Sequence, residues 1–419
     1  MEGIEVIDFA DMEEEEMNYT LMNAEHEVLG FEVDGCGQTG VTEILDGFTY
    51  APLHFARPAG DMRALNIDLN TFLRRRTIEL TRGDASAVFA AAGVSDGLAL
   101  SLRSMGLSLA DRYWYRPAGS GLKWADVSCF DREFDTGFGE AVLKRDYAAL
   151  AKADPLTPDC TLGGVSRKAW IRLDGAPMLL KAEEGTSSFI TQSELLSARL
   201  TERLLDRGDY VAYTKVDFAG ESYIACHSMV GDGEEFVPAH DVLCAMDFTA
   251  ADSFKYISKD GELLAQFTKA LTQLGVDNVD AYFAKIAAVF DLSLAGDCHL
   301  QNFGFIRDLN TMRLRVAPLF DRGRSFGSFG KPLENGKFSC AEYAIGSART
   351  MFVMMLFHSI LIRSDWDFGW YDPARLEGFE DEMDSMLAVC ADIPKEYIEI
   401  LKEAFRYQLD YLNKAAEKA

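Results

Sequence analysis

The sequence predicts an α+β protein with two lobes and an additional N-terminal β/α domain. Alternating, strand-like segments fill much of the region between residues 161 and 229, and helical patterns dominate from residue 265 onward. The predicted helices include 374–390 and 395–416, which follow Pro373 and Pro394, as is typical of prolines at helix starts. Residues 151–159 contain two prolines and little periodicity, which is typical of a domain boundary. We therefore predict an N-terminal recognition or regulatory domain (1–152), a first lobe (153–230) and a helical second lobe (231–419).

The charge of the chain argues against partners that are themselves acidic. The 419 residues include 41 Lys and Arg and 67 Asp and Glu, so the formal net charge is −26. Such a chain repels nucleic acids and anionic membranes unless it has a local basic patch. The one compact basic cluster, residues 74–76, is interpreted as the solvated face of a helix. We expect neither direct nucleic-acid binding nor a membrane partner.

Cysteine usage and hydropathy indicate a cytoplasmic protein. The eight cysteines are scattered without a C-x-x-C pair or metal-like spacing to the six histidines, as expected for reduced thiols. The first residues lack the basic and apolar regions of a signal peptide. The longest apolar run, Met351 to Ile362, is too short to span a bilayer and is predicted to form a buried helix.

The first 150 residues contain structural signals but no group of catalytic side chains. Residues 1–17 are acidic and are predicted to be solvated, and Asn18–Ala24 with Glu27–Val33 predict a β-hairpin. Residues 84–92 and 95–105 predict short helices, each followed by a glycine. The aromatic run at residues 113–115 predicts a packed strand.

A glycine loop and a hairpin follow the predicted boundary. Two strands flank the Asp174-Gly175 turn, and the second of them ends near Lys181. A lysine in a largely apolar strand suggests an anionic partner. The loop before the first strand supplies backbone amides that could approach a polyphosphate. The four residues of this loop are Gly163, Gly164, Val165 and Ser166.

An acidic helix and two more strands come next. Residues 193–205 have apolar positions at helical spacing, with Glu194 predicted in the first turn, where it would either pair with Lys181 or simply suit the helix N-terminus. Residues 210–216 and 221–229 alternate like strands. The chain is expected to cross into the second lobe near His227 and Met229, whose backbone groups could bond an adenine.

The chemically richest stretch is Gly296–Arg307, which reads G-D-C-H-L-Q-N-F-G-F-I-R. It follows a long amphipathic segment and precedes a predicted strand, and it holds Asp297, His299 and Asn302 within six residues. A second acid, Asp321, follows the next strand-like segment. Two acids and an amide in this order suit phosphoryl transfer from Mg-ATP. Asp297 would take the proton of the acceptor hydroxyl, and Asn302 and Asp321 would bind the metal.

The loop and the P-L-F-D-R-G sequence ending at Gly323 resemble those of the HipA-like (CtkA-like) bacterial serine/threonine kinases. The resemblance is best over residues 160–321 and weak over the first 150. It implies a protein-kinase-like fold that uses ATP and Mg²⁺ to phosphorylate serine or threonine on a protein. In that pattern Lys181 neutralises the α and β phosphates and Glu194 holds Lys181. Asp297 is the base, His299 orients the loop, and Asn302 with Asp321 binds Mg²⁺.

The resemblance also implies a regulator. The family includes toxins of toxin–antitoxin pairs, so an antitoxin or other regulatory protein is an expected partner. A serine at the start of the family's glycine loop can be autophosphorylated. This chain has Thr161 at that position, and Ser166 is a second candidate.

Three other functions remain open on sequence grounds. The D-x-H-x-x-N order is shared with phosphoinositide kinases, so a small-molecule or lipid kinase is the first. A catalytically weak binding protein is disfavoured because both metal-ligand positions are kept. A regulator linked to a phage or mobile element would combine the same core with a partner-binding first domain.

Overall fold

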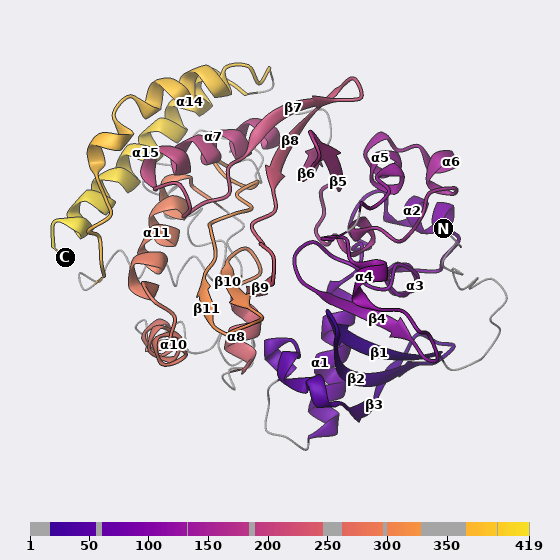
Figure 1. Cartoon of the computed structure of the whole chain (residues 1–419). Coiled ribbons are helices and arrows are strands. Elements are labelled where there is room, and N and C mark those ends of the chain that lie inside the picture. Colours follow the sequence, from indigo (N-terminus) through magenta and orange to yellow (C-terminus); the bar gives the residue numbers. More distant parts are fainter. Residues whose placement is uncertain are drawn as a thin grey trace. The chain divides into compact units, whose positions relative to one another are not determined.

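The computed structural model describes residues 17–55, 61–131, 133–183, 189–245, 262–295, 300–327, 366–391 and 393–418 (Figure 1). The chain divides into two compact units. The first contains Met1–Ala182 and Val230–Glu235, and the second contains Glu183–Met229 and Phe236–Ala419. The predicted first lobe, 153–230, has residues in both units, and the predicted three-part division with boundaries at 152 and 230 stays a prediction.

A four-stranded antiparallel sheet with the order β3-β2-β1-β4 organises the first unit. The predicted hairpin is confirmed as β1 (Met17–Asn23) and β2 (His26–Val33), and β3 spans Thr39–Ile44. The predicted aromatic strand is confirmed as β4 (Tyr113–Pro117), and its three aromatic side chains are buried. Buried apolar residues of α1 (Met62–Arg75) pack with this sheet in one core.

Short helices complete the first unit beside the sheet. The predicted helices are confirmed as α2 (Ala85–Ala92) and α3 (Gly97–Arg103). Asp96 caps α3 by accepting the Ala99 N–H, and Gly93 ends α2 in the left-handed region. The remaining elements before the glycine loop are η2 (Asp46–Tyr50), η3 (Leu53–Phe55), α4 (Trp124–Val127), α5 (Gly137–Lys144), α6 (Tyr147–Leu150) and η4 (Pro158–Thr161).

The prediction that residues 74–76 form a solvated basic face is wrong for Arg76. Its side chain is buried and pairs with Asp111, and it also donates to the carbonyl oxygens of Gly106 and Tyr113. Arg76 follows the last residue of α1, so its side chain joins the end of that helix to the start of β4. Arg74 and Arg75 are exposed, as predicted.

The predicted hairpin after the glycine loop is confirmed as β5 (Lys168–Leu173) and β6 (Ala176–Ala182). Asp174 and Gly175 both have positive φ (51° and 82°), as a two-residue type I′ turn requires. Two residues of this turn fix the register of the whole hairpin. Leu173 therefore lies opposite Ala176, and Lys168 lies opposite Lys181.

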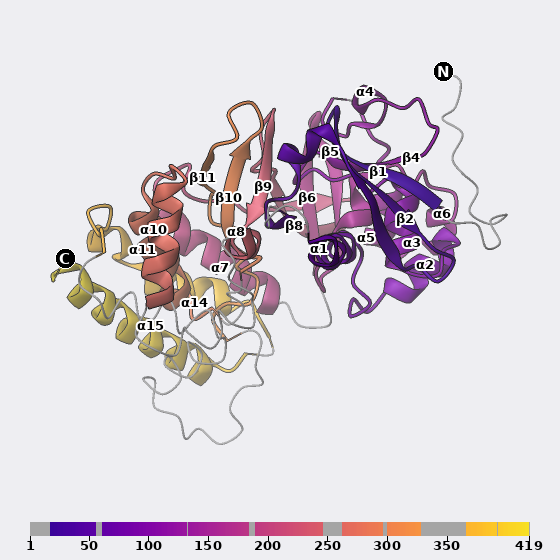
Figure 2. The same cartoon turned by 90° about the horizontal axis from the view of Figure 1, so that it is seen from below.

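The second unit combines helices with short strands. Helices α7 (Phe189–Leu204), α11 (Val279–Leu292), α14 (Phe379–Leu387) and α15 (Lys395–Ala416) pack against one another (Figure 2). Arg203 of α7 pairs with Glu382 of α14 at 3.2 Å. The other elements are β7 (Thr214–Phe218), β8 (Glu221–His227), α8 (Ala239–Ala245), α10 (Glu262–Gln273), β10 (Gly304–Asp308), β11 (Leu314–Val316) and η5 (Pro373–Leu376).

Strand β9 (Glu234–Pro238) joins the two units covalently. Its first residues belong to the first unit, where buried Glu235 accepts a hydrogen bond from Asn23 at 2.9 Å. Its last residues lie beside β10 in the sheet β11-β10-β9 of the second unit. The chain therefore leaves the second unit after Met229 and returns to it at Phe236.

Several predicted element boundaries differ from the structure. Helix α7 begins at Phe189 rather than at Ser193, so Glu194 lies in the second turn and not in the first. The segment predicted as one helix over 374–390 forms η5 followed by α14. The last predicted helix is confirmed as α15, with Pro394 as its N-cap. The apolar run at 351–362 lies outside the described residues.

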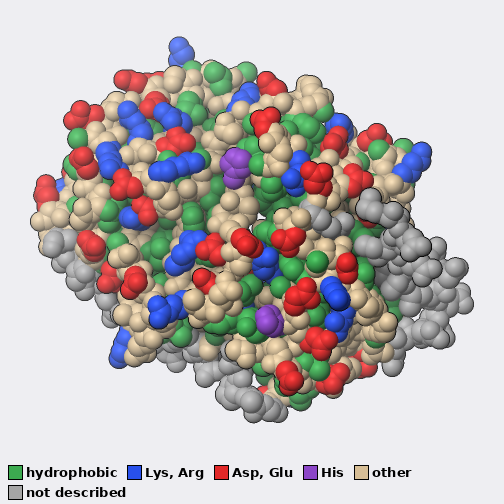
Figure 3. Space-filling view, in the orientation of Figure 1, with side chains coloured by type: hydrophobic (Ala, Val, Ile, Leu, Met, Phe, Trp, Pro, Cys, Tyr) green, Lys and Arg blue, Asp and Glu red, His purple; other side chains and the backbone are tan. Residues whose placement is uncertain are grey.

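The described surface mixes both charges. Acidic and basic side chains are interspersed on the face drawn in Figure 3. Within the described ranges no single helix is long and apolar enough to cross a membrane, although α2 and α3, bent by 45°, meet the length and composition test together. The six described cysteines are free thiols, and five of them are buried.

Candidate functional site

The glycine loop joins η4 to β5 in the first unit. Gly164 has a positive φ of 88°, which favours glycine there. Its backbone N–H donates to Oε1 of Glu79 at 2.8 Å. The Gly164 amide was predicted to face a phosphate, but in the structure it binds a carboxylate. Glu79 was not predicted from the sequence, because it lies 85 positions away in a segment without a motif.

Two lysines lie directly opposite each other on the hairpin behind this loop. Lys168 of β5 pairs in register with Lys181 of β6, so both side chains emerge on one face of the hairpin. Lys181 is buried, with 9% of its surface exposed, and Lys168 Nζ lies against Gly164. Like charges placed directly opposite destabilise a strand pair unless acidic groups or an anion compensate them. Two ammonium groups on one face of the hairpin are a feature that a polyanion can bind.

Sequence reasoning selected Lys181 and missed Lys168 as its neighbour. The signal was present, because a two-residue Asp-Gly turn specifies which residues face each other across a hairpin. Counting outward from Asp174 and Gly175 places Lys168 opposite Lys181.

Buried Asp159 anchors the base of the glycine loop. It accepts the backbone N–H of Trp170 in β5 at 2.7 Å and the hydroxyl of Thr157 at 2.8 Å. Burial raises the pKa of Asp159 from 3.8 to about 7, against the opposing effects of these two hydrogen bonds and of Arg82. The carboxyl group thus fastens the helical turn before the loop to the strand after it.

The hydroxyl of Thr161, before the glycine loop, is hydrogen-bonded to the backbone. The hydroxyl donates to the carbonyl oxygen of Leu107 at 2.7 Å and lies 3.2 Å from that of Pro158. The residue therefore stabilises the turn into the loop. Ser166, the second candidate for phosphorylation, is half-buried farther along the loop.

In the second unit, two predicted acids converge on one glycine. Glu194 is 5% exposed on α7, and Asp321 follows β11. A Cβ placed on Gly323 would lie 3.0 Å from Glu194 Oε2 and 3.8 Å from Asp321 Oδ1. Both carboxylates therefore border the same backbone position, and the absence of a side chain at Gly323 leaves room between them.

Asp321 has an unusual backbone conformation. Its φ is +48°, in the left-handed region that non-glycine residues rarely adopt. Its N–H donates to Tyr213 Oη at 3.0 Å, and Val211 N–H donates to the carbonyl oxygen of Leu319 at 2.9 Å just before it. These contacts hold Asp321 in a conformation of the kind that is common at functional sites.

Asn302 lies at the same end of the β10–β11 hairpin as Asp321. Asn302 precedes β10 and Asp321 follows β11, and these two strands are antiparallel. Asn302 is 8% exposed, and the backbone around it is pinned to the start of α8. The carbonyl oxygens of Leu300 and Phe303 accept N–H groups of His240 (3.1 Å) and Ala239 (3.0 Å), respectively.

Arg322 is a buried cation that sequence reasoning did not select. It is 2% exposed, and its Nη2 donates to the carbonyl oxygen of Val211 at 3.4 Å. Its Nε and Nη1 have no hydrogen-bond partner within the part of the chain that the structure describes. Burial lowers the pKa of Arg322, while Tyr213, Glu194 and Asp321 oppose this effect. Its charge therefore partly compensates the two carboxylates beside Gly323.

The remaining predicted residues are placed as follows. Asp297 and His299 lie outside the described residues. His227 is exposed at the end of β8, and Met229 is half-buried just after it. The glycine loop and Lys181 belong to the first unit, whereas Glu194, His227, Met229, Asn302 and Asp321 belong to the second. The predicted ion pair between Lys181 and Glu194 joins the units and stays a prediction.

The donor set of the second unit fits Mg²⁺. Within the described ranges, no group of three or more Asp, Glu, His or Cys side chains is arranged to hold a metal. Magnesium in phosphotransfer sites is usually held by one or two carboxylates together with substrate phosphates and water. The oxygen atoms of Asp321 and Asn302, at one end of a hairpin, match that requirement.

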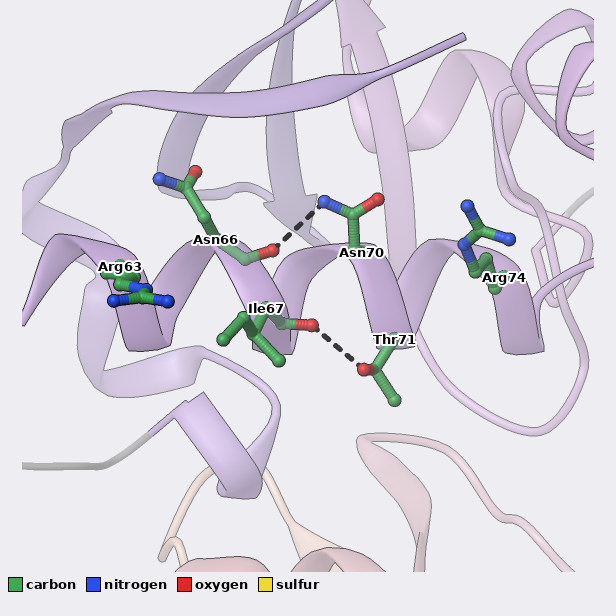
Figure 4. A pocket seen from close by; sticks show the side chains of 6 residues that line it. All are labelled: Arg63, Asn66, Ile67, Asn70, Thr71 and Arg74. Atoms are coloured by element: carbon green, nitrogen blue, oxygen red, sulfur yellow. Dashed lines mark hydrogen bonds between the residues drawn. The ribbon is translucent and has the colours of Figure 1, made fainter.

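Two hollows in the first unit are lined by none of the predicted site residues. One of about 660 Å³ runs along α1 and is lined by Arg63, Asn66, Ile67, Asn70, Thr71 and Arg74 (Figure 4). The other has a volume of about 890 Å³ and is bordered by residues 77–81, among others. Glu79 therefore lies on the rim of this second cavity and also contacts the glycine loop.

Comparison with known proteins finds distant structural similarity only. No family model and no curated protein matches the chain. The proinflammatory kinase CtkA of Helicobacter pylori is 14% identical with a TM-score of 0.36, covering 61% of this chain and 93% of that one. HipA of Shewanella oneidensis MR-1, solved with HipB and operator DNA, is 12% identical with a TM-score of 0.49, covering 94% and 97%. At these values we base the proposed function on this chain's own residues.

Proposed function

We propose that the protein is an ATP- and Mg²⁺-dependent phosphotransferase that phosphorylates serine or threonine hydroxyls of a protein. The observation that carries the proposal is the convergence of Glu194 and Asp321 on Gly323, with Asn302 at the same end of the β10–β11 hairpin. Buried Glu194 and half-buried Asp321 place two carboxylates beside one backbone position, with Arg322 compensating part of their charge. This arrangement is suited to a cation that carries phosphates.

The residues predicted to bind the cofactor would bind the nucleotide. Lys181 and the amides of the glycine loop would contact the phosphates, and Glu194 would orient Lys181. The segment that contains His227 and Met229 would supply backbone groups for the adenine. Burial of Lys181 would strengthen its attraction for phosphate, because charges interact more strongly away from bulk water.

Asn302 and Asp321 would hold Mg²⁺, which neutralises and orients the phosphate oxygens when it is bound. Asp297 would accept the proton of the attacking hydroxyl, and His299 would orient the loop that contains it. The left-handed backbone of Asp321, held by Tyr213, fixes one ligand before the nucleotide arrives. Preorganised charge of this kind lowers the barrier to transfer.

The proposal extends to a partner through the sequence resemblance. An antitoxin or another regulatory protein is a proposed partner, and residues 1–152 would contact it. The expectation of no direct nucleic-acid contact rests on the net charge of −26, and the comparisons do not support it. It stays a prediction, as does the cytoplasmic location.

Two measurements on the full-length protein test the proposal. In a thermal-shift titration, ATP with Mg²⁺ should raise the melting temperature more than ATP with chelator, and Asp321→Asn should remove that difference. With γ-labelled ATP and cell lysate, the wild type should label protein on serine or threonine. Asp297→Asn should lower transfer by roughly 10²–10⁴-fold and change Mg-ATP binding much less.

Each measurement has an outcome against the proposal. Equal thermal shifts with Mg²⁺ and with chelator would remove the metal assignment. Label that appears in lipid or in a small molecule instead of protein would favour the alternative kinase classes. Equal labelling by the wild type and by Asp297→Asn would move the catalytic role to another residue.

A further inference from the structure

The carboxylate of Glu79 occupies a position that a phosphate ligand would need. Glu79 Oε1 accepts the N–H of Gly164 at 2.8 Å, and a Cβ placed on Gly163 would lie 3.7 Å from the same oxygen. Both glycines belong to the loop whose amides are proposed to cover the phosphates. A bound phosphate at these amides would therefore meet a negative charge, and Gly164 N–H could not serve both anions at full strength.

We propose that Glu79 is a built-in competitor for the phosphate-binding amides of the glycine loop, and that it sets the affinity for nucleotide. The inference rests on the proposed function and adds a control element to the same site. Phosphate binding would exchange one anion for another on the Gly164 N–H, and Glu79 would swing away. Lys168, whose Nζ lies against Gly164, would then face the incoming phosphate.

The surroundings of Glu79 allow such an exchange. The segment after α1 that contains Glu79 is exposed at this point, and neighbouring Leu80 is 73% exposed. The same segment borders the cavity of about 890 Å³, so the side chain has open space beside it. Among the described residues, the hydrogen bond to the other carboxylate oxygen, Glu79 Oε2, comes from the exposed hydroxyl of Thr81 alone, at 3.1 Å. Little packing has to be broken when the carboxylate leaves.

A competitor and a structural anchor predict opposite results. Glu79→Gln keeps an oxygen that can accept the Gly164 N–H and removes the charge, whereas Glu79→Ala removes both. If Glu79 competes with phosphate, both variants should bind Mg-ATP about three- to tenfold more tightly, which is the scale of one partly exposed charge-assisted hydrogen bond. If Glu79 only positions the loop, Glu79→Ala should bind more weakly and Glu79→Gln should be unchanged.

The experiment measures Mg-ATP binding to the full-length protein by calorimetry for the wild type, Glu79→Gln and Glu79→Ala. Glu25→Gln, at an exposed turn, is the matched control for loss of one negative charge and should not change the dissociation constant. Lys181→Ala tests the proposed function separately and should weaken binding in every background.

The outcomes separate the two proposals. Tighter binding by both Glu79 variants, or binding by these variants when the wild type binds too weakly to measure, supports the competitor role. If the wild type binds and Lys181→Ala weakens it, unchanged or weaker binding by Glu79→Gln overturns the inference and leaves the function standing. If no variant binds Mg-ATP, the proposed function fails and the inference fails with it.

Hydrogen exchange gives a readout that does not depend on nucleotide. The Gly164 amide of the ligand-free wild type should be protected, and Glu79→Ala should exchange it faster. Adding tripolyphosphate should slow exchange of the Gly164 amide in both proteins. Glu79→Ala should need a lower tripolyphosphate concentration for this effect than the wild type does. Identical exchange in the two proteins would show that the contact is not formed in solution, which would also overturn the inference.

Discussion

Replacing Asp159 with Asn should make the first unit more stable at neutral and alkaline pH. The wild-type carboxyl group is buried between Trp170 N–H and the hydroxyl of Thr157, and burial raises its pKa to about 7. Asn has nearly the same shape, keeps an oxygen for the Trp170 N–H and cannot ionise. Its amide can donate to Thr157, whose hydroxyl also accepts. The substitution therefore isolates the effect of the buried charge.

The sign and size follow from proton binding. In the unfolded chain Asp159 ionises near its ordinary pKa of 3.8, but in the folded protein it stays protonated up to about pH 7. The folded state thus holds one more proton between these values, and the free energy of unfolding falls as pH rises through that window. At 1.36 kcal/mol per pH unit up to the folded pKa, the wild type loses about 2.7 kcal/mol between pH 5 and pH 8 through this group, and the loss levels off above pH 7.

Urea unfolding at several pH values measures the effect. Trp114, Trp124 and Trp170 lie in one core cluster of the first unit, so their fluorescence reports its unfolding. The difference in unfolding free energy between Asp159→Asn and the wild type should rise by about 2.7 kcal/mol from pH 5 to pH 8. Comparing variant with wild type cancels the other titrating groups.

One control variant and one possible result test whether burial raises the pKa of Asp159. Asp131→Asn, at an exposed position and measured at the same pH values, is the matched control for the loss of one acidic side chain. A difference for Asp159→Asn that does not change with pH would mean that the carboxyl group ionises in its ordinary range. The reasoning about its burial would then be refuted.

Two further predictions concern the loops of the proposed site. Gly323→Ala should lower phosphotransfer by about tenfold or more, because the new methyl group would lie 3.0 Å from a carboxylate oxygen and shift it. Gly83→Ala, where nothing lies within 4 Å, is the matched control, and equal rates for the two would show that the position is not sensitive. Mass spectrometry after incubation with Mg-ATP should find phosphate on Ser166 and not on Thr161, whose hydroxyl is bound to backbone carbonyls. Asp297→Asn should show neither, and phosphate on Thr161 in the active protein would contradict the structural assignment.

Much of the local structure could be predicted from the sequence because its causes are local. The Asp174-Gly175 turn and the alternation around it predicted the β5–β6 hairpin, and the structure confirms both. The long helix at 395–416 was predicted to the residue by its periodicity and by the proline before it. The order of acids and amide from Asn302 to Asp321 likewise indicated a hairpin with functional groups at one end, and these two residues do lie at that end.

Prediction from the sequence fails where the position or role of a side chain depends on residues far away in the chain. Arg76 was expected to be solvated with its two neighbours, but three groups from the region before and within β4 bury it. The start of α7 could not be placed, because residues 189–192 have no strong periodic pattern, and Glu194 consequently moved from the first turn to the second. Helix boundaries are decided by packing as much as by propensity.

Tertiary structure alone decided which chemical groups meet. The amino-acid order predicted Asp321 as a metal ligand, but only folding shows that Glu194, 127 positions earlier, shares the space beside Gly323 with it. The same is true of Glu79 and Gly164, and of Arg322 with the two acids that act on its charge. Turns and periodic segments are specified by interactions among neighbours in the chain, whereas burial and charge pairing depend on contacts that form only when remote segments pack together.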